Sequence, residues 1–426
     1  MTVATTDRSL PKFAEVAGGG LLDRRLFLKQ GALFGLATLV AQTAGAEAGQ
    51  RPAWMRVPGA PLSNYGQPSP NEAEVIRWVA ANPDAPGNGI SWTPLHRLAG
   101  TITPSGLHFE RHHNGVPQID PALHQLLIHG LVERPLIFGL PQLHRYPMIS
   151  RQCFIECGGN SNAGWHEEPM QAVAGNLHGL VSCSEWTGIP VRMLLEEAGI
   201  KAAAGWVIAE GADAAAMNVS IPLAKLLDDG ILALFQNGEK LRPENGYPMR
   251  LVLPGYEGVL NVKWLRRLQL AAQPLMARNE TAKYTELQPD GKARQFTFVM
   301  EAKSVVTHPS PGYRLEGAGY YQISGLAWSG RGKIVTVEVS ADGGHSWAPS
   351  ELQEPVLSKS FTRFRVPWQW NGQPCVIKSR AVDDTGYRQP ERRILVAERG
   401  RNGYFHYNAI VAWAVDADGG LHHVYA

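Results

Sequence analysis

The chain has 426 residues, of which 44% are hydrophobic and 18% charged, and its 40 basic and 38 acidic residues leave a formal net charge of +2. This length and composition are typical of a globular protein with two domains and do not fit a disordered or coiled-coil protein. Because no block of like charge occurs, nothing in the sequence indicates a nucleic-acid partner.

The first 46 residues have the features of an export signal. Arg24 and Arg25 precede the apolar run 31–41, and the small residues 44–46 follow at a cleavage spacing. We therefore expect a twin-arginine signal peptide over residues 1–46, cleaved after Ala46, and a periplasmic protein. The apolar run is shorter than the roughly twenty residues of a spanning helix, and no later run is longer, so no membrane span is expected. The twin-arginine route carries folded proteins, which favours a cofactor inserted before transport.

The next part of the chain predicts an irregular arm followed by an α+β domain. Residues 47–100 are rich in proline, glycine and asparagine, which favours an arm wrapped on the core. Apolar residues recur at helical spacing between Pro190 and Gly199, and a second helix is expected from Pro222 to Gly230. Short apolar runs such as 249–253 predict strands between the helices. Together these segments form a predicted domain over residues 47–294.

After residue 295 the pattern changes to a period of two. Val335, Val337 and Val339 alternate with polar residues, and residues 342–344 form a turn sequence. Further runs of this kind lie at 361–366 and 375–382. They predict an immunoglobulin-like β-sandwich over residues 295–426.

The four cysteines have no disulfide or zinc framework, and no haem-attachment sequence occurs. Cys157 has the most suggestive context, since a strand-like apolar run leads to it and a Gly-Gly-Asn loop follows. The missing side chains would let a bulky ligand approach the backbone, and a thiolate suits a soft metal. In isolation, however, such a cysteine is more often a packed core residue. Cys153 and Cys183 are expected to be small core residues.

Several segments, in the same order along the chain, resemble the sulfite oxidase family of mononuclear molybdenum enzymes. In the first domain these segments are 109–113, 156–160, 210–213, 246–250, 262–264 and 282–284. In the second domain they are 327–330, 339–344 and 378–384. The resemblance implies an α+β fold with a sulfite oxidase-type molybdopterin domain, followed by an immunoglobulin-like β-sandwich that holds a dimer. It also implies a molybdenum–molybdopterin cofactor.

The resemblance assigns roles to particular residues. Cys157 would ligate molybdenum, Arg111 would face the metal, and Tyr284 would be the active-site tyrosine. The residues implied to bind the cofactor are Phe109, His113, Asp213, Asn245, Arg250, Asn261, Val262 and Lys263. Of these, Arg250 offers a planar fork and Lys263 a point charge for the pterin phosphate. His108 and His112 receive no role, and the histidine cluster lacks the second pair of a zinc site.

The sequence also departs from the family pattern at positions that bind a substrate anion. Asn162 and Asn176 stand where the family has an arginine and a tryptophan, and the stretch 404–408 lacks a further arginine. Fewer cations weaken a site for a small dianion. This combination resembles the sulfane dehydrogenase branch of the family, in which the substrate is sulfane sulfur on a cysteine of a sulfur-carrier protein. Sulfite dehydrogenation, with free sulfite as the substrate, is the alternative.

The same branch implies partners. Electrons would leave to a c-type cytochrome subunit, and the β-sandwich would hold a homodimer within a heterotetramer. Two other interpretations remain: the methionine sulfoxide reductase branch, which the long C-terminal sandwich argues against, and a non-enzymatic periplasmic binding module.

Overall fold

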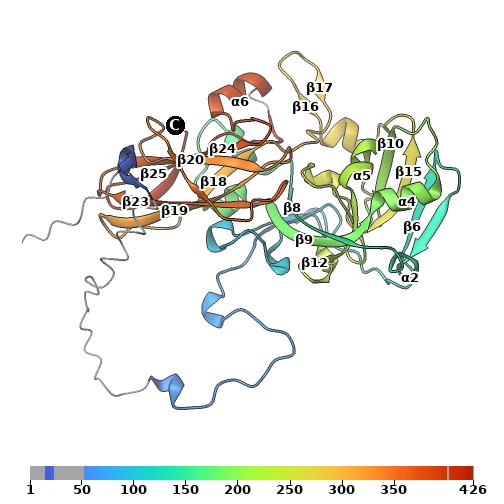
Figure 1. The fold of residues 1–426 in the computed structure, drawn as a ribbon, viewed down its shortest axis with the longest axis horizontal. Coiled ribbons are helices and arrows are strands. Elements are labelled where there is room, and N and C mark those ends of the chain that lie inside the picture. Colours follow the sequence, from blue (N-terminus) through green and yellow to red (C-terminus); the bar gives the residue numbers. More distant parts are fainter. Residues whose placement is uncertain (1–14, 24–51, 401–402, 426) are drawn as a thin grey trace, which may run out of the picture.

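The computed structural model describes residues 15–23, 52–400 and 403–425. They form two lobes, one with most of the helices and the other built from long strands (Figure 1). Most of the predicted signal peptide, including its cleavage site at Ala46, lies outside the described residues. Within them, no helix has both the length and the apolar character to cross a membrane.

Two five-stranded sheets form the first lobe. One has the order β11-β10-β15-β6-β7, and all its neighbours are antiparallel except β15 and β6. These strands are β6 (Gln125–Gly130), β7 (Leu136–Gly139), β10 (Trp206–Gly211), β11 (Asn218–Pro222) and β15 (Leu265–Ala271). The other has the order β13-β12-β9-β8, with β14 paired to β12. Its strands are β8 (Ile149–Glu156), β9 (Val181–Pro190), β12 (Ile231–Gln236), β13 (Glu239–Lys240) and β14 (Arg250–Val252).

The two predicted helices of this lobe are confirmed. Helix α4 (Val191–Ala198) buries the apolar residues that recur at helical spacing, and Gly199 ends it with a φ of 76° that favours glycine. Helix α5 (Leu223–Asp229) follows Pro222 and ends before Gly230. Both pack into the apolar core of the lobe. The other α-helices of the described residues, in both lobes, are α2 (Leu140–Leu143), α3 (Ala174–His178) and α6 (Arg392–Arg399).

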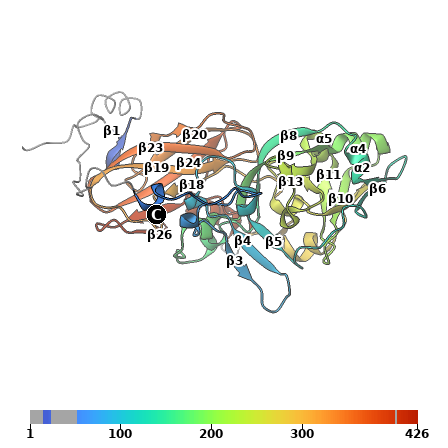
Figure 2. The same cartoon turned by 90° about the horizontal axis from the view of Figure 1, so that it is seen from below.

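The N-terminal arm differs from the prediction in two ways. It is not wholly irregular, because β3 (Trp78–Ala81) and β4 (Gly89–Trp92) pair with each other and with β5 (Glu110–His112) in a three-stranded sheet that projects from the body (Figure 2). In addition, residues 52–75 are not wrapped on the core, since nearly all of them are exposed. Their apolar side chains are too sparse to pack as a unit.

The second lobe is a sandwich of two sheets, as predicted. One has the order β1-β2-β23-β19-β18, with β22 paired to β23, and the other the order β21-β20-β24-β25-β26. The strands of the first sheet are β1 (Glu15–Ala17), β2 (Leu21–Leu22), β18 (Lys303–His308), β19 (Gly319–Trp328), β22 (Glu351–Leu352) and β23 (Thr362–Trp370). Those of the second are β20 (Ile334–Ser340), β21 (Ala348–Pro349), β24 (Cys375–Asp383), β25 (Ala412–Val415) and β26 (Leu421–Val424).

The alternation predicted for β20 holds for only part of the strand. Val337 and Val339 are buried, whereas Val335 is 51% exposed. The register of β20 against β24 shifts between Ile334 and Thr336, so the extra residue of this bulge turns Val335 away from the core.

The two lobes share one apolar core. The largest buried cluster contains sandwich residues such as Trp328 and Phe364 together with Phe154 of β8 and Val181 of β9. Strand β8, which leads to Cys157, is therefore packed against the sandwich. This continuity fixes the end of β8 relative to both lobes.

Candidate active site

Cys157 lies at the end of β8, in a loop that glycine makes possible. The last four residues of β8 are buried, and the Cys157 amide donates to the Leu180 carbonyl at 2.9 Å. A Cβ at Gly158 would lie 2.1 Å from Glu257 Oε1, so a larger residue there would displace the buried Glu257 side chain. Burial raises the pKa of the Cys157 thiol to about 11, so a nearby cation is needed to hold it as a thiolate.

A cavity with an empty volume of about 840 Å³ opens beside Cys157. All eleven residues predicted as catalytic or cofactor-binding line it: Phe109, Arg111, His113, Cys157, Asp213, Asn245, Arg250, Asn261, Val262, Lys263 and Tyr284. The structure thus brings together residues that are as much as 175 positions apart in the sequence (109 to 284).

Arg111, His113 and Tyr284 lie with Cys157 in one part of this cavity. His113 Nε2 is 3.4 Å from the Tyr284 hydroxyl. Burial, with Arg111 as the next cause, lowers the pKa of His113 to about 4, so the ring is neutral at pH 7. Burial, followed by the nearby Cys157, raises the pKa of Tyr284, which therefore keeps its proton. Tyr284 or His113 can therefore donate a hydrogen bond to a group bound at Cys157, and Arg111 places a fixed positive charge beside that group.

Arg250 and Lys263 form a second, cationic part of the cavity. Arg250 is 3% exposed and donates only to the backbone carbonyls of Asn245 (2.8 Å) and Asn261 (3.0 Å), and its Nε has no partner. Burial, followed by Arg250, lowers the pKa of Lys263 far below its usual value. Neither cation makes an ion pair within the described parts of the chain. Carboxylates of Glu110, Asp213 and Glu244 lie near Lys263 without forming an ion pair with it. A buried guanidinium and a partly buried amine, neither of them in an ion pair with a described residue, suit the binding of an anion.

Other predicted residues shape the cavity through their loops. Asp213 Oδ1 accepts from the Met217 amide at 3.1 Å and so closes its own loop. Asn261 bonds three backbone groups, with Oδ1 accepting from Leu253 N at 2.7 Å and Nδ2 donating to two carbonyls. The side chain of Asn261 is therefore used to hold the loop. Asn245 donates to Gln236 Oε1 at 2.9 Å and leaves its own Oδ1 without a partner.

His112, which received no role from the sequence, also lines the cavity. Its Nδ1 is 2.8 Å from Lys263 Nζ, and its Nε2 is 2.6 Å from Glu110 Oε2. Trp264 stacks against the His112 ring, and Lys263 Nζ lies over the face of Trp264, 4.5 Å from the ring centroid. Because adjacent residues of a strand point to opposite faces, a period-two pattern could not show that His112 and His113 border the same cavity. Asn162 and Asn176 do not line it.

The sandwich holds the Cys157 loop through a buried network around Glu156. This carboxylate accepts from Trp328 Nε1 at 2.7 Å and from Asn160 Nδ2 at 2.9 Å, and lies 3.4 Å from Lys303 Nζ. Lys303 also donates to Ser161 Oγ at 2.5 Å. Lys303 and Glu156 are both nearly inaccessible to solvent. We call Glu156, Asn160, Ser161, Lys303 and Trp328 the loop clamp.

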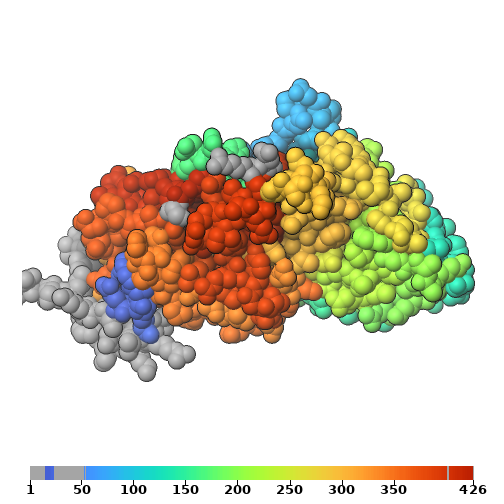
Figure 3. Space-filling model, turned by 90° about the horizontal axis from the view of Figure 1, so that it is seen from above, coloured from blue at the N-terminus to red at the C-terminus, as the bar shows by residue number. Residues whose placement is uncertain are grey.

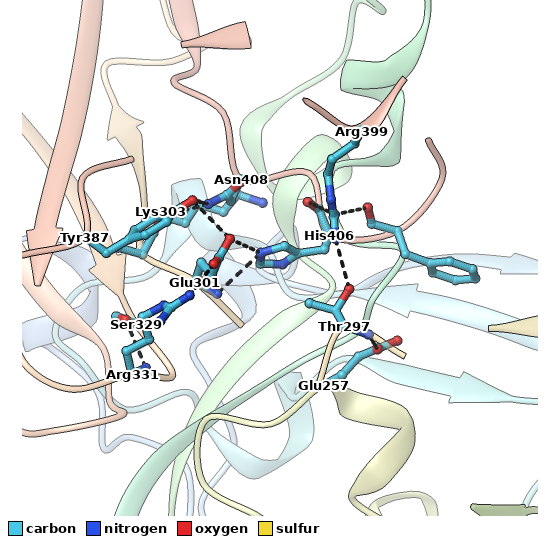
Figure 4. Close-up of polar contacts among 12 residues, drawn as sticks. Glu257, Thr297, Glu301, Lys303, Ser329, Arg331, Tyr387, Arg399, His406 and Asn408 are labelled. Atoms are coloured by element: carbon cyan, nitrogen blue, oxygen red, sulfur yellow. Dashed lines mark hydrogen bonds and ion pairs between the residues drawn. The ribbon is translucent and has the colours of Figure 1, made fainter. Parts of the chain in front are cut away.

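The stretch 404–408 covers the loop from the other side. The His406 amide donates to the Gly158 carbonyl at 2.6 Å, and Phe405 stacks on Tyr284 with ring centroids 5.3 Å apart. Arg399 donates to the carbonyls of Phe405 and His406, and Figure 4 shows how His406 continues to Glu301. An aromatic wall, made of Tyr404 and Phe405, therefore stands beside Cys157 where the sequence lacks the family's arginine.

The residues present fit a molybdenum–molybdopterin cofactor. One region offers a single soft thiolate ligand, and the other offers unpaired cations with an orphaned Arg250 Nε for a phosphate. In the described residues no group of three His, Cys, Asp or Glu side chains could hold a metal by itself. A metal bound at Cys157 would have this thiolate as a protein ligand, and a cofactor held by Arg250 and Lys263 in the same cavity could supply others.

Comparisons with known proteins agree with this geometry. A family model described as an oxidoreductase molybdopterin-binding domain matches residues 113–278, and one described as a Mo-co oxidoreductase dimerisation domain matches residues 294–412. The solved structure of the sulfane dehydrogenase SoxCD from Paracoccus pantotrophus is 43% identical with a TM-score of 0.85, and the match covers 88% of this chain and 98% of that chain.

Sulfite oxidases are among the curated relatives. Chicken sulfite oxidase is 31% identical over 315 residues, which cover 68% of this chain and 68% of the relative. Mouse mitochondrial sulfite oxidase is 30% identical over 317 residues, again 68% of this chain. The chain spans 58% of the length of the mouse protein.

Proposed function

The chain belongs to the sulfite oxidase family of molybdopterin oxidoreductases, and from that premise we propose that it is a sulfane dehydrogenase subunit, which oxidises sulfane sulfur carried on a cysteine of a partner protein. The observation that carries this proposal is the aromatic wall beside Cys157. It stands on a fold shared with the Paracoccus sulfane dehydrogenase at 43% identity.

The bound cofactor supplies oxygen-atom transfer to sulfur, with the oxygen coming from water. The chain positions that chemistry. Arg250 and Lys263 would hold the pterin phosphate, and the Cys157 thiolate would ligate the metal. Arg111 would stabilise negative charge that develops on the oxidised sulfur. The Tyr284 hydroxyl, beside the neutral His113, is placed to donate a hydrogen bond or pass a proton.

The surroundings of Cys157 favour a sulfur chain over a small dianion. Near Cys157, Arg111 is the only cation lining the cavity in the described part of the chain. Phe405 and Tyr404 do not line the cavity, but they lie against Gly158 and Gly159 and add aromatic surface beside the Cys157 loop. A dianion that enters such a site loses a large hydration free energy and gains the interaction with one cation. A persulfide on a cysteine loses much less hydration free energy. This difference supports sulfur attached to a carrier protein as the substrate.

The proposal extends to location and partners. Arg24, Arg25 and the apolar run after them support export of residues 47–426 to the periplasm by the twin-arginine route. A c-type cytochrome subunit would accept the electrons, and two copies would pair through the sandwich, whose family model is named for dimerisation. The assembly would be a heterotetramer.

The test uses protein purified from the periplasm with its molybdenum content measured. It is mixed anaerobically with cytochrome c and given either sulfite or a carrier protein with a persulfidated cysteine. Reduction with the carrier and not with sulfite is expected. Reduction with sulfite alone would overturn the substrate assignment. Cys157→Ser should fold with the wild-type melting temperature and lose all turnover, while Cys375→Ser is the matched control on a cysteine far from the cavity.

Free sulfite is the second candidate. It is favoured by Arg111 in the cavity and by the two relatives named sulfite oxidase. In this case the aromatic wall would have no effect on selectivity, and Phe405→Leu would leave the ratio of the two activities unchanged.

A further inference from the structure

The first described segment, residues 15–23, is packed on the sandwich although it is more than 300 positions away in sequence. Figure 3 shows it as a blue patch on the orange surface of that lobe. It lies directly before Arg24 and Arg25, and none of the site residues contacts it. We propose that the sandwich carries a docking site for Glu15–Leu22, which holds the segment before the twin arginine on the folded domain. This inference rests on the proposed export of the chain.

The contacts are those of a built site. Leu21 and Leu22 are 0% and 1% exposed, and Leu21 belongs to the large core shared by the two lobes. Leu21 also pairs with Trp368 of β23, so the two short strands β2 and β1 extend the sheet. Trp368 Nε1 donates to the Gly19 carbonyl at 2.7 Å. A segment that lay near the surface without packing on it would not bury two leucine side chains completely.

Two glycines allow this approach. A Cβ at Gly20 would lie 1.9 Å from the Gln369 carbonyl oxygen, and the φ of Gly20 is 86°. A Cβ at Gly19 would lie 2.4 Å from the Ala341 carbonyl oxygen, and its φ is 73°. Both positions exclude other residues on steric and on backbone grounds. The Gly-Gly-Gly-Leu-Leu sequence is therefore matched to this surface.

The turn after β20 completes the site. The Gly18 amide donates to Ser346 Oγ at 2.7 Å, and Ser346 is held by Asp342 through its hydroxyl at 2.6 Å. Asp342 begins the turn sequence recognised at 342–344. The site is thus assembled from this turn and β23, which come from the last quarter of the chain. It exists only after the C-terminal domain has folded, so docking can take place only on a folded precursor.

The experiment is hydrogen exchange, followed by mass spectrometry, on the full-length precursor isolated from the cytoplasm. The amides of residues 18–22 are expected to exchange at least tenfold more slowly than those of an exposed stretch such as 57–62. Gly20→Val should abolish this protection. The matched control is Gly59→Val, since Gly59 has no atom within 4 Å of its Cβ position and no positive φ.

Protection of β19 amides shows in every variant that the sandwich is folded. Fast exchange at 18–22 in the wild type, or unchanged protection in Gly20→Val, would overturn the docking site. Fractionation of the same cells measures export independently, as the amount of the protein in the periplasm. A protected segment in a protein that never reaches the periplasm would uphold docking and overturn the proposed location, and an exported protein without protection would do the reverse.

Discussion

Lys263 shows at the scale of one residue how the cavity is prepared for an anion. In the described residues its Nζ has only neutral hydrogen-bond partners, namely His112 Nδ1 at 2.8 Å, the Glu244 carbonyl at 3.2 Å and the Arg111 carbonyl at 3.4 Å. Burial, and after it the positive charge of the nearby Arg250, lower the pKa of Lys263 far below its usual value. An anion in the cavity would relieve both costs at once, because it restores the charge balance of the pair.

Lys263→Met should therefore weaken retention of the cofactor. A methionine keeps the apolar stem and removes one charge-assisted hydrogen bond. We expect about tenfold less molybdenum to be retained after mild chaotrope treatment, equivalent to about 1.4 kcal/mol. Metal analysis of the desalted protein checks this, with the exposed Lys201→Met as the control. Equal retention in the two variants would remove Lys263 from the cofactor site.

At the scale of elements, the loop clamp makes β18 and β19 of the sandwich part of the active-site framework. Lys303 lies on β18 and Trp328 on β19, and both reach Glu156 at the end of β8. The charge of Lys303 and that of Glu156 are buried together. Removing one of such a pair leaves the other uncompensated in a low-dielectric interior.

Lys303→Met should lower the free energy of unfolding by about 3–5 kcal/mol. The double variant with Glu156→Gln should recover much of that loss, because neither charge is then left alone. Urea unfolding of the single and double variants measures the coupling, and the exposed Lys333→Met is the control. Additive losses in the double variant would show that the two side chains do not act as a pair.

At the scale of the whole molecule, Glu301 holds His406, whose amide joins the second lobe to the Cys157 loop. Burial alone would raise the pKa of this carboxyl, but hydrogen bonds from His406, Arg331 and Tyr387 outweigh burial and lower the pKa to about 2 (Figure 4). Arg331 donates at 2.5 Å and Tyr387 at 3.0 Å. Since His406 also bonds Gly158, this carboxylate supports the segment that covers the Cys157 loop.

The lowered pKa predicts a dependence of stability on pH. A carboxyl whose pKa is lower in the folded state stabilises it fully above its ordinary pKa of 4.5, and this stabilisation is lost as the pH falls from about 4.5 towards 2. The contribution is at most roughly 3 kcal/mol. Glu301→Gln should therefore melt at a lower temperature than the wild type at pH 7 and show a flatter decline below pH 4.5. The exposed Glu316→Gln should follow the wild-type curve, and identical curves for Glu301→Gln would contradict the role of this carboxylate.

Local patterns in the sequence determined the elements and the candidate residues. The spacing of apolar residues predicted helix α4, because a helix is stabilised by contacts between residues three and four positions apart, and Gly199 predicted where that helix ends. The order of the segments around Arg111, Cys157 and Lys263 was enough to identify the family, and those residues do line one cavity. Such features depend on neighbours in the sequence or on short segments, so they can be predicted from the sequence without knowledge of the fold.

Only the tertiary structure decided how these parts act on one another. The loop clamp joins Glu156 to Lys303 and Trp328 across 147 and 172 positions, and Phe405 covers Tyr284 from the far end of the chain. Docking of Leu21 on β23 and the bulge that exposes Val335 are of the same kind. None of these contacts repeats along the sequence, because each follows from how two distant segments happen to pack, and packing is fixed only when the whole core is assembled.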